Sequence, residues 1–307
     1  MAGFKQPDVL VLGGGGILGE AWMLAVLAGM QQESGFDPRE CDAFVGTSAG
    51  SIVAAVLSAG IDPRDRLGRL PEQPEVGEES PAPAGGAARA RVTRLALQGA
   101  RGAAAPFAAA GLRTTAPGGA LFRRTLLGLA PTGRRSLRGL GDHLEREGAR
   151  WDGRLQVSAV ELGSGKRVMF GAPDAPEASV GQAVEASCAI PGVFEPVEIG
   201  GREYVDGGAW SPTNLDVAPV ERGGRVLCLN PTGSLRGALA GSLAVVSRSV
   251  ASVEALALQR RGARVKLVAP DAASVEAFGS NLMNPRPRAA VVAAGLAQGR
   301  ALGVSQP

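Results

Sequence analysis

Gly46-Thr47-Ser48-Ala49-Gly50 separates an apolar run that ends at Val45 from a second apolar run over residues 52–57. An apolar strand, a small-residue pentapeptide centred on serine and a helix-forming run are together typical of a nucleophile elbow. The flanking glycines leave room for a sharp turn, and the free N–H groups that begin the next helix favour negative charge beside Ser48. Taken alone, the pentapeptide fits a helix entry with Ser48 as N-cap equally well.

A glycine-rich loop, residues 13–19, follows the apolar run at residues 9–12. Its spacing fits the dinucleotide-binding pattern G-x-G-x-x-G, but the acid that this pattern requires at the end of the next strand is missing. A plain tight turn is a second interpretation. The third is an oxyanion hole, whose backbone N–H groups stabilise a tetrahedral intermediate by roughly 3–4 kcal/mol each. Because a serine elbow follows one crossover later, we favour the third interpretation.

A nucleophilic serine needs a general base, and the single histidine is poorly placed for that role. In α/β-hydrolases the chain order is serine, acid, histidine, whereas His143 precedes Asp206 and lies in a polar segment typical of a solvent-facing side chain. Asp206 is the better candidate, because it follows a strand-like run and precedes Gly207-Gly208. A carboxylate within hydrogen-bond reach of a serine hydroxyl can accept its proton. Alone, Asp-Gly-Gly also fits a β-turn.

Composition restricts the class of protein. The chain has 307 residues, of which 45% are hydrophobic, and a formal net charge of +3. This allows a sizeable core, while the charge is too small to indicate nucleic-acid binding. Cys41, Cys188 and Cys228 lie in apolar contexts, which predicts buried free thiols in a reducing compartment. With one histidine, no cysteine pairs and no carboxylate cluster, we expect no metal and no cofactor.

The amino-terminal segment shows no signal-sequence pattern. The longest uncharged stretch, residues 43–61, contains the serine pentapeptide at its centre. A buried strand followed by a buried helix explains this stretch better than a membrane span. We therefore expect a soluble, cytoplasmic protein.

Strand and helix patterns alternate along the chain, which predicts one α/β domain over residues 1–307 with a mainly parallel central sheet flanked by helices. The expected strands are 8–12, 43–45, 155–162, 167–170, 197–199, 203–205, 225–229 and 265–268, and the expected helices are 20–30, 49–59, 140–147, 180–189, 235–259 and 288–302. The glycine loop and the pentapeptide then follow parallel strands, at the edge where sites gather in open α/β sheets.

Residues 71–138 form an insert of different composition within this domain. Residues 71–86 combine prolines with glutamates and predict a solvated loop. Residues 89–138 hold ten arginines and no acidic residue, interleaved with leucine and phenylalanine. We expect a basic helical cap over the mouth of the site. Its arginines fit contact with an anionic membrane surface, and they fit equally an ordinary cap whose arginines face water.

Four blocks in this order resemble the patatin-like phospholipases: residues 13–19, 46–50, 186–194 (Ala-Ser-Cys-Ala-Ile-Pro-Gly-Val-Phe) and 206–208. The resemblance covers roughly residues 8–59 and residue 155 onward, whereas the insert resembles no family. It implies a Ser-Asp dyad with Ser48 as nucleophile and Asp206 as general base. It also implies an oxyanion hole formed by the glycine-loop amides of Gly14, Gly15 and Gly16. The motif glycines that would support this site are Gly19, Gly46, Gly50, Gly207 and Gly208.

The resemblance implies hydrolysis of lipid acyl esters through an acyl-Ser48 intermediate, without a cofactor. The family commonly has Arg or Lys before the last glycine of the loop, where this chain has Leu18. That departure makes phospholipids less certain substrates and favours neutral esters, thioesters or acyl transfer. Two alternatives therefore stay open: an acyltransferase or thioesterase with the same dyad, and a non-catalytic lipid- or nucleotide-binding module. Peripheral contact with the inner membrane face would follow from the arginines of residues 89–138.

Overall fold

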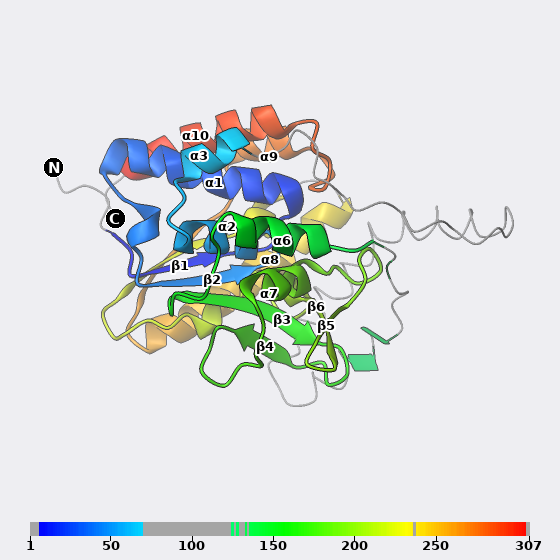
Figure 1. The fold of residues 1–307 in the computed structure, drawn as a ribbon. Coiled ribbons are helices and arrows are strands. Elements are labelled where there is room, and N and C mark those ends of the chain that lie inside the picture. The colour runs from blue at the N-terminus through cyan, green and yellow to red at the C-terminus, as the bar shows by residue number, and fades with distance from the viewer. Residues whose placement is uncertain are drawn as a thin grey trace, which may run out of the picture.

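The computed structural model describes residues 6–69, 124–125, 127–128, 133, 135–235 and 238–304. These residues form a mixed sheet of mostly parallel strands flanked by helices (Figure 1), so the predicted α/β class is confirmed. The predicted basic helical insert at residues 71–138 lies almost wholly outside the described residues and stays a prediction.

The strands of this sheet lie in the order β5-β6-β3-β2-β1-β7-β8, and β4 pairs with β3 off this path. Their bounds are β1 Val9–Leu12, β2 Ala43–Thr47, β3 Leu155–Glu161, β4 Arg167–Phe170, β5 Val197–Ile199, β6 Arg202–Asp206, β7 Arg225–Leu229 and β8 Arg264–Val268. The pairs β1–β2, β1–β7, β2–β3 and β7–β8 are parallel. The pairs β3–β4, β3–β6 and β5–β6 are antiparallel. Short turns join β3 to β4 and β5 to β6, as antiparallel pairing allows.

All six predicted helices are present, and each has at least one end at a different residue. The α-helices are α1 Gly16–Ser34, α2 Ala49–Ser58, α3 Pro63–Arg69, α6 Arg138–Arg146, α7 Val180–Cys188, α8 Ala238–Arg260, α9 Ala272–Phe278 and α10 Arg288–Val304. Short 3-10 helices are η1 Pro38–Glu40, η2 Gly207–Ala209, η3 Leu215–Val217 and η4 Pro231–Ser234. The sequence patterns did not predict α3 and α9, because each is only two turns long and lacks a sustained apolar period.

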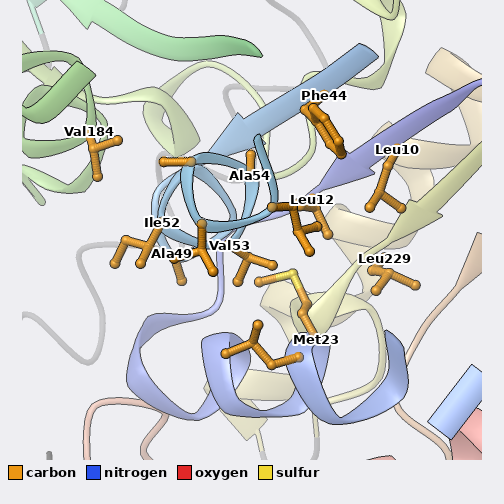
Figure 2. Close-up of a cluster of buried hydrophobic side chains, with 14 of the residues drawn as sticks. Leu10, Leu12, Met23, Phe44, Ala49, Ile52, Val53, Ala54, Val184 and Leu229 are labelled. Carbon is orange, nitrogen blue, oxygen red and sulfur yellow. The ribbon is translucent and has the colours of Figure 1, made fainter. Parts of the chain in front are cut away.

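The two faces of the sheet have separate cores, because side chains alternate along each strand. Leu10 and Leu12 of β1 belong to a core shared with α1, α2 and α7, and Figure 2 shows part of this cluster around α2. Val9 and Val11 point to the other face, where they share a core with Leu258 of α8. Strands buried on both faces read as continuous apolar runs, and β1 is such a run.

Helix α10 covers the outer side of α1, which explains why α1 is apolar on nearly all sides. Glycines at every fourth position of α10 allow the two backbones to approach closely. A Cβ at Gly299 would lie 2.2 Å from the carbonyl oxygen of Val26, and one at Gly295 would lie 2.8 Å from Ala25 Cβ. The indole N–H of Trp22 donates to Gln298 Oε1 at 2.9 Å. The carboxyl-terminal helix is therefore part of the main core.

The backbones of β1 and α2 approach each other most closely at Gly50, in the first turn of α2. A Cβ added to Gly50 would lie 2.0 Å from the carbonyl oxygen of Leu12 and 2.8 Å from that of Gly13. Neither atom belongs to a flexible side chain, so the helix itself would have to move. Gly50 therefore sets how closely the serine pentapeptide lies to the glycine loop.

We expect Gly50→Ala to lower the free energy of unfolding by about 3 kcal/mol or more, the upper end for overpacking, because the clash is with backbone. Gly68→Ala is the matched control, since nothing lies within 4 Å of its added Cβ and alanine favours helix by up to about 1 kcal/mol. Urea denaturation measures both. Equal stability of the Gly50→Ala variant and the wild type would contradict the close contact.

Candidate active site

Strand β3 brings the two candidate catalytic side chains together. Its first half pairs with β2, where Thr47 lies opposite Ser158. Its second half pairs with β6, where Asp206 lies opposite Ala159. Because β4 pairs with residues of both halves, β2 and β6 must share the opposite edge of β3. Strand β2 is parallel and β6 antiparallel to β3, so their carboxyl ends meet, and Ser48 follows directly after β2.

Ser48 adopts the backbone geometry of a sharp elbow. Its φ is 51° and its ψ is −125°, a conformation that costs a non-glycine residue on the order of 1–3 kcal/mol and is characteristic of functional sites. Its N–H donates to Ser187 Oγ at 2.8 Å, and its carbonyl accepts from Ser51 Oγ at 2.6 Å. Its side chain makes no capping hydrogen bond to α2. Ser48 is thus the N-cap residue of α2 by position, as the alternative interpretation held, but its hydroxyl does not cap the helix.

Asp206 is held in a tight turn at the end of β6 and is 6% exposed. Its Oδ1 accepts from the N–H of Gly208 at 2.7 Å. Burial raises the pKa of Asp206 to about 6, while hydrogen bonds from the Ser48 hydroxyl and the Gly208 N–H act in the opposite direction. A Cβ at Gly207 would lie 2.2 Å from Ser158 Oγ. Glycine at this position thus lets the turn lie directly against β3.

The glycine loop lies against the serine. A Cβ at Gly14 would be 3.5 Å from Ser48 Cβ. The N–H of Gly14 already donates to the carbonyl of Pro212 at 2.9 Å, so in this conformation it anchors the loop. Within the described ranges, the N–H groups of Gly15 and Gly16 have no hydrogen-bond partner. Of the three amides expected to be oxyanion donors, those of Gly15 and Gly16 are therefore unpaired in this conformation, whereas that of Gly14 is already in use.

The single histidine lies on α6 and faces solvent, as expected. Its side chain is 42% exposed, and its Nε2 lies 3.5 Å from Glu147 Oε2 and 3.3 Å from Arg66 Nη1. Arg66 is buried and also lies 3.4 Å from Glu20. His143 thus belongs to a charged cluster between α1, α3 and α6, and none of its contacts involves the serine elbow.

Cys41, Cys188 and Cys228 are buried and unpaired, as predicted. Burial raises the pKa of the Cys188 thiol, which lies 3.9 Å from Ser51 Oγ. A thiol in this environment is inert as a nucleophile. Ser187, which precedes Cys188, does more than pack, because its Oγ accepts a hydrogen bond from the Ser48 N–H.

Several polar residues beside the elbow and the Asp206 turn were not predicted from the sequence. The most connected is Asn214, eight positions after Asp206, which contacts Thr47, Ser158 and Arg167. A Thr-Asn pair after a proline is a common loop sequence, so the pattern alone carries little signal. The proximity of these residues depends on long-range pairing of β2, β3 and β6.

Protein-family comparison matches residues 10–219 to the family described as patatin-like phospholipase. The chain belongs to the patatin-like phospholipase family. Members of this family are typically lipid hydrolases. A search of curated protein sequences found no significant match. Among solved structures, VipD from Legionella pneumophila is similar, with 15% sequence identity and a TM-score of 0.44 over 98% of this chain and 67% of that one.

The patatin-like match does not extend to the carboxyl-terminal third of the chain, which nevertheless contacts the glycine loop. The N–H of Leu18 donates to the carbonyl of Leu282 at 3.0 Å, and the Leu18 side chain is fully buried. At the position where the family commonly has a basic residue, this member thus has an apolar side chain in the core. Leu18 therefore contributes packing and no charge at this loop.

The described ranges contain no group of three or more His, Cys, Asp or Glu side chains that could hold a metal ion. None of their helices combines the length and apolar character needed to span a bilayer.

Burial of Asp206 predicts a pH-dependent stability. In the unfolded chain an aspartate ionises near pH 4, whereas folded Asp206 keeps its proton to about pH 6. Raising the pH from 4 to 6 therefore destabilises the folded state, by about 3 kcal/mol at most. We expect Asp206→Asn to be more stable than wild type at pH 8 and equally stable at pH 4, as measured by urea denaturation.

The exposed carboxylate of Asp174 provides the control, because Asp174→Asn should not change stability by more than about 0.5 kcal/mol at either pH. If Asp206→Asn destabilises the protein at pH 8 as much as at pH 4, the aspartate does not carry the penalty that its burial implies.

Proposed function

We propose that this patatin-like protein is a lipid acyl hydrolase that cleaves acyl esters through an acyl-Ser48 intermediate. The observation that carries the proposal is the meeting of Ser48 and Asp206 at the carboxyl ends of β2 and β6. There the Asp206 carboxyl is buried beside a serine on a strained elbow, and the serine hydroxyl opposes the rise in the pKa of Asp206 that burial causes. This pairing provides a nucleophile and a base without a histidine.

In the proposed reaction Ser48 Oγ attacks the ester carbonyl carbon, and Asp206 accepts the hydroxyl proton. The tetrahedral intermediate collapses when the C–O bond to the leaving group breaks, and Asp206 returns the proton to the departing alkoxide. A water molecule then attacks the acyl-serine and gives a proton to Asp206. The C–Oγ bond breaks, and Asp206 returns the proton to Ser48 Oγ, which releases the fatty acid and restores the dyad. A base with a pKa of about 6 is largely ionised at neutral pH.

In this proposal the oxyanion hole consists of the Gly15 and Gly16 amides, which are two of the three donors expected from the sequence. Support comes from their unpaired N–H groups in the described structure and from the contact between the neighbouring Gly14 and Ser48. The positive end of α1, which starts at Gly16, also favours a developing negative charge there.

The substrate class that we favour is a neutral lipid ester. Leu18 brings no positive charge to the loop, so phosphate binding there loses the partner that Arg or Lys would offer. The same dyad supports transfer of the acyl group to an alcohol, or attack on a thioester. Adding a long-chain alcohol to the reaction would distinguish transfer from hydrolysis, because only transfer forms a new ester.

The decisive test of the dyad is labelling with a fluorophosphonate, followed by intact-protein mass measurement. We expect one adduct on the wild type and none on Ser48→Ala. We expect Asp206→Asn to lose ester hydrolysis by a factor of at least about 100, as loss of a general base predicts. His143→Ala is the matched control and should keep most activity, because His143 contacts only the Arg66–Glu147 cluster.

A well-folded His143→Ala variant without activity would exclude the Ser-Asp mechanism. A folded wild-type protein that forms no adduct, with or without lipid vesicles, would exclude an activated serine altogether.

Contact with an anionic membrane surface remains a proposal from sequence, since it rests on the arginines of residues 89–138. We expect Arg123→Glu combined with Arg124→Glu to weaken sedimentation with vesicles that contain anionic lipid, because each basic residue near such a surface contributes about 1 kcal/mol. Vesicles of neutral lipid are the control. Unchanged sedimentation would indicate a cap whose arginines face water.

A further inference from the structure

Asn214 occupies an unusual place between the elbow and the Asp206 turn. It is fully buried and has a left-handed backbone, with φ of 49° and ψ of 36°. In the described structure Ser48 is the other non-glycine residue with positive φ. Asparagine tolerates this conformation better than most residues. A buried polar side chain on a strained backbone persists only where the surrounding contacts hold it in place.

The side-chain N–H groups of Asn214 face acceptors from both halves of the dyad. Its Nδ2 lies 3.0 Å from Thr47 Oγ1 and 3.1 Å from Ser158 Oγ. It also lies 2.9 Å from the carbonyl of Ser211 and 3.4 Å from that of Gly207. One amide group is thus shared between the residue before Ser48 and the residue after Asp206.

The orientation of this amide is determined by its other end. Asn214 Oδ1 accepts from Arg167 Nη1 at 3.2 Å. A guanidinium can only donate, so the oxygen must face Arg167 and the NH₂ group must face the dyad. Arg167 is itself fixed by two hydrogen bonds to Asp216, at 2.7 and 2.8 Å, and its guanidinium lies 5.2 Å from the ring centroid of Trp210.

We propose that Asn214 is a positioning residue that sets the distance and orientation between Ser48 and Asp206, an inference that rests on the proposed hydrolase function. Asn214 acts through Thr47 and Gly207 and touches no reacting atom. Strands β2 and β6 are not hydrogen-bonded to each other, since each pairs with β3. The shared amide therefore links two strand ends that backbone hydrogen bonds leave independent.

The test compares Asn214→Gly and Asn214→Asp with the wild type. Glycine keeps the left-handed backbone and removes the amide, whereas aspartate keeps the size and replaces the NH₂ donors. Because misplacement by about 1 Å can cost on the order of 100-fold, we expect kcat to fall about 10- to 100-fold. The fluorophosphonate labelling rate of Ser48 should fall in parallel, with KM changed by less than about threefold.

Gln298→Ala is the control for a purely structural effect. Gln298 is also a buried amide with several partners, namely Trp22, Asp271, Ser274 and the carbonyl of Ala269. These lie in α1, in α9 and in the segment just before α9, and none belongs to the elbow or the Asp206 turn. We expect this variant to lower the melting temperature as Asn214→Gly does, while its kcat and labelling rate stay at wild-type values.

The outcomes distinguish failure of the positioning role of Asn214 from failure of the proposed hydrolase function. If the wild type is labelled and both Asn214 variants are labelled at the wild-type rate, the positioning role is excluded and the hydrolase proposal stands. If Gln298→Ala loses as much kcat as Asn214→Gly at equal melting temperature, the effect of Asn214 is general destabilisation and the inference is also overturned. A wild type that is never labelled overturns both.

Discussion

One edge of strand β3 is shared by two other strands, and the rest of the site depends on this arrangement. A strand in a sheet normally has one neighbour along each edge. Here β2 ends opposite Ser158 and β6 ends opposite Ala159, so two carboxyl termini from opposite directions meet on consecutive residues of β3. Segments that are more than 150 residues apart in the chain thereby lie within hydrogen-bond distance.

The site is assembled at a cost in stability that the surrounding core offsets. A carboxylate at 6% exposure, a serine with positive φ and several buried polar side chains all oppose folding when considered alone. The described structure satisfies nearly all of them with hydrogen bonds. Such polar networks restrict the arrangements that a core can adopt, and that restriction is useful where two side chains must keep a fixed separation.

The sequence predicted the fold class and the order of most elements, because each depends on local patterns. Apolar runs, glycine turns and a serine flanked by small residues can all be recognised in a single segment. The role of Ser187 and the connections of Asn214 were not predicted, since both depend on residues brought together by pairing across the sheet. The role of Gly14 could be predicted only in part. Its flexibility is evident from sequence, whereas its hydrogen bond to Pro212 is a tertiary contact.

Gly295, Gly299 and Gly303 of α10 pack against α1, and Leu282 contacts Leu18. These contacts determine how much of the chain is needed for folding. Similarity to the family ends at residue 219, yet β7, a direct neighbour of β1, begins at Arg225. A protein cut at the end of the similarity would lose one neighbour of β1 and the cover of α1. The part of the chain that matches the family is therefore smaller than the unit that must fold cooperatively, and the unmatched third contacts the glycine loop through Leu282.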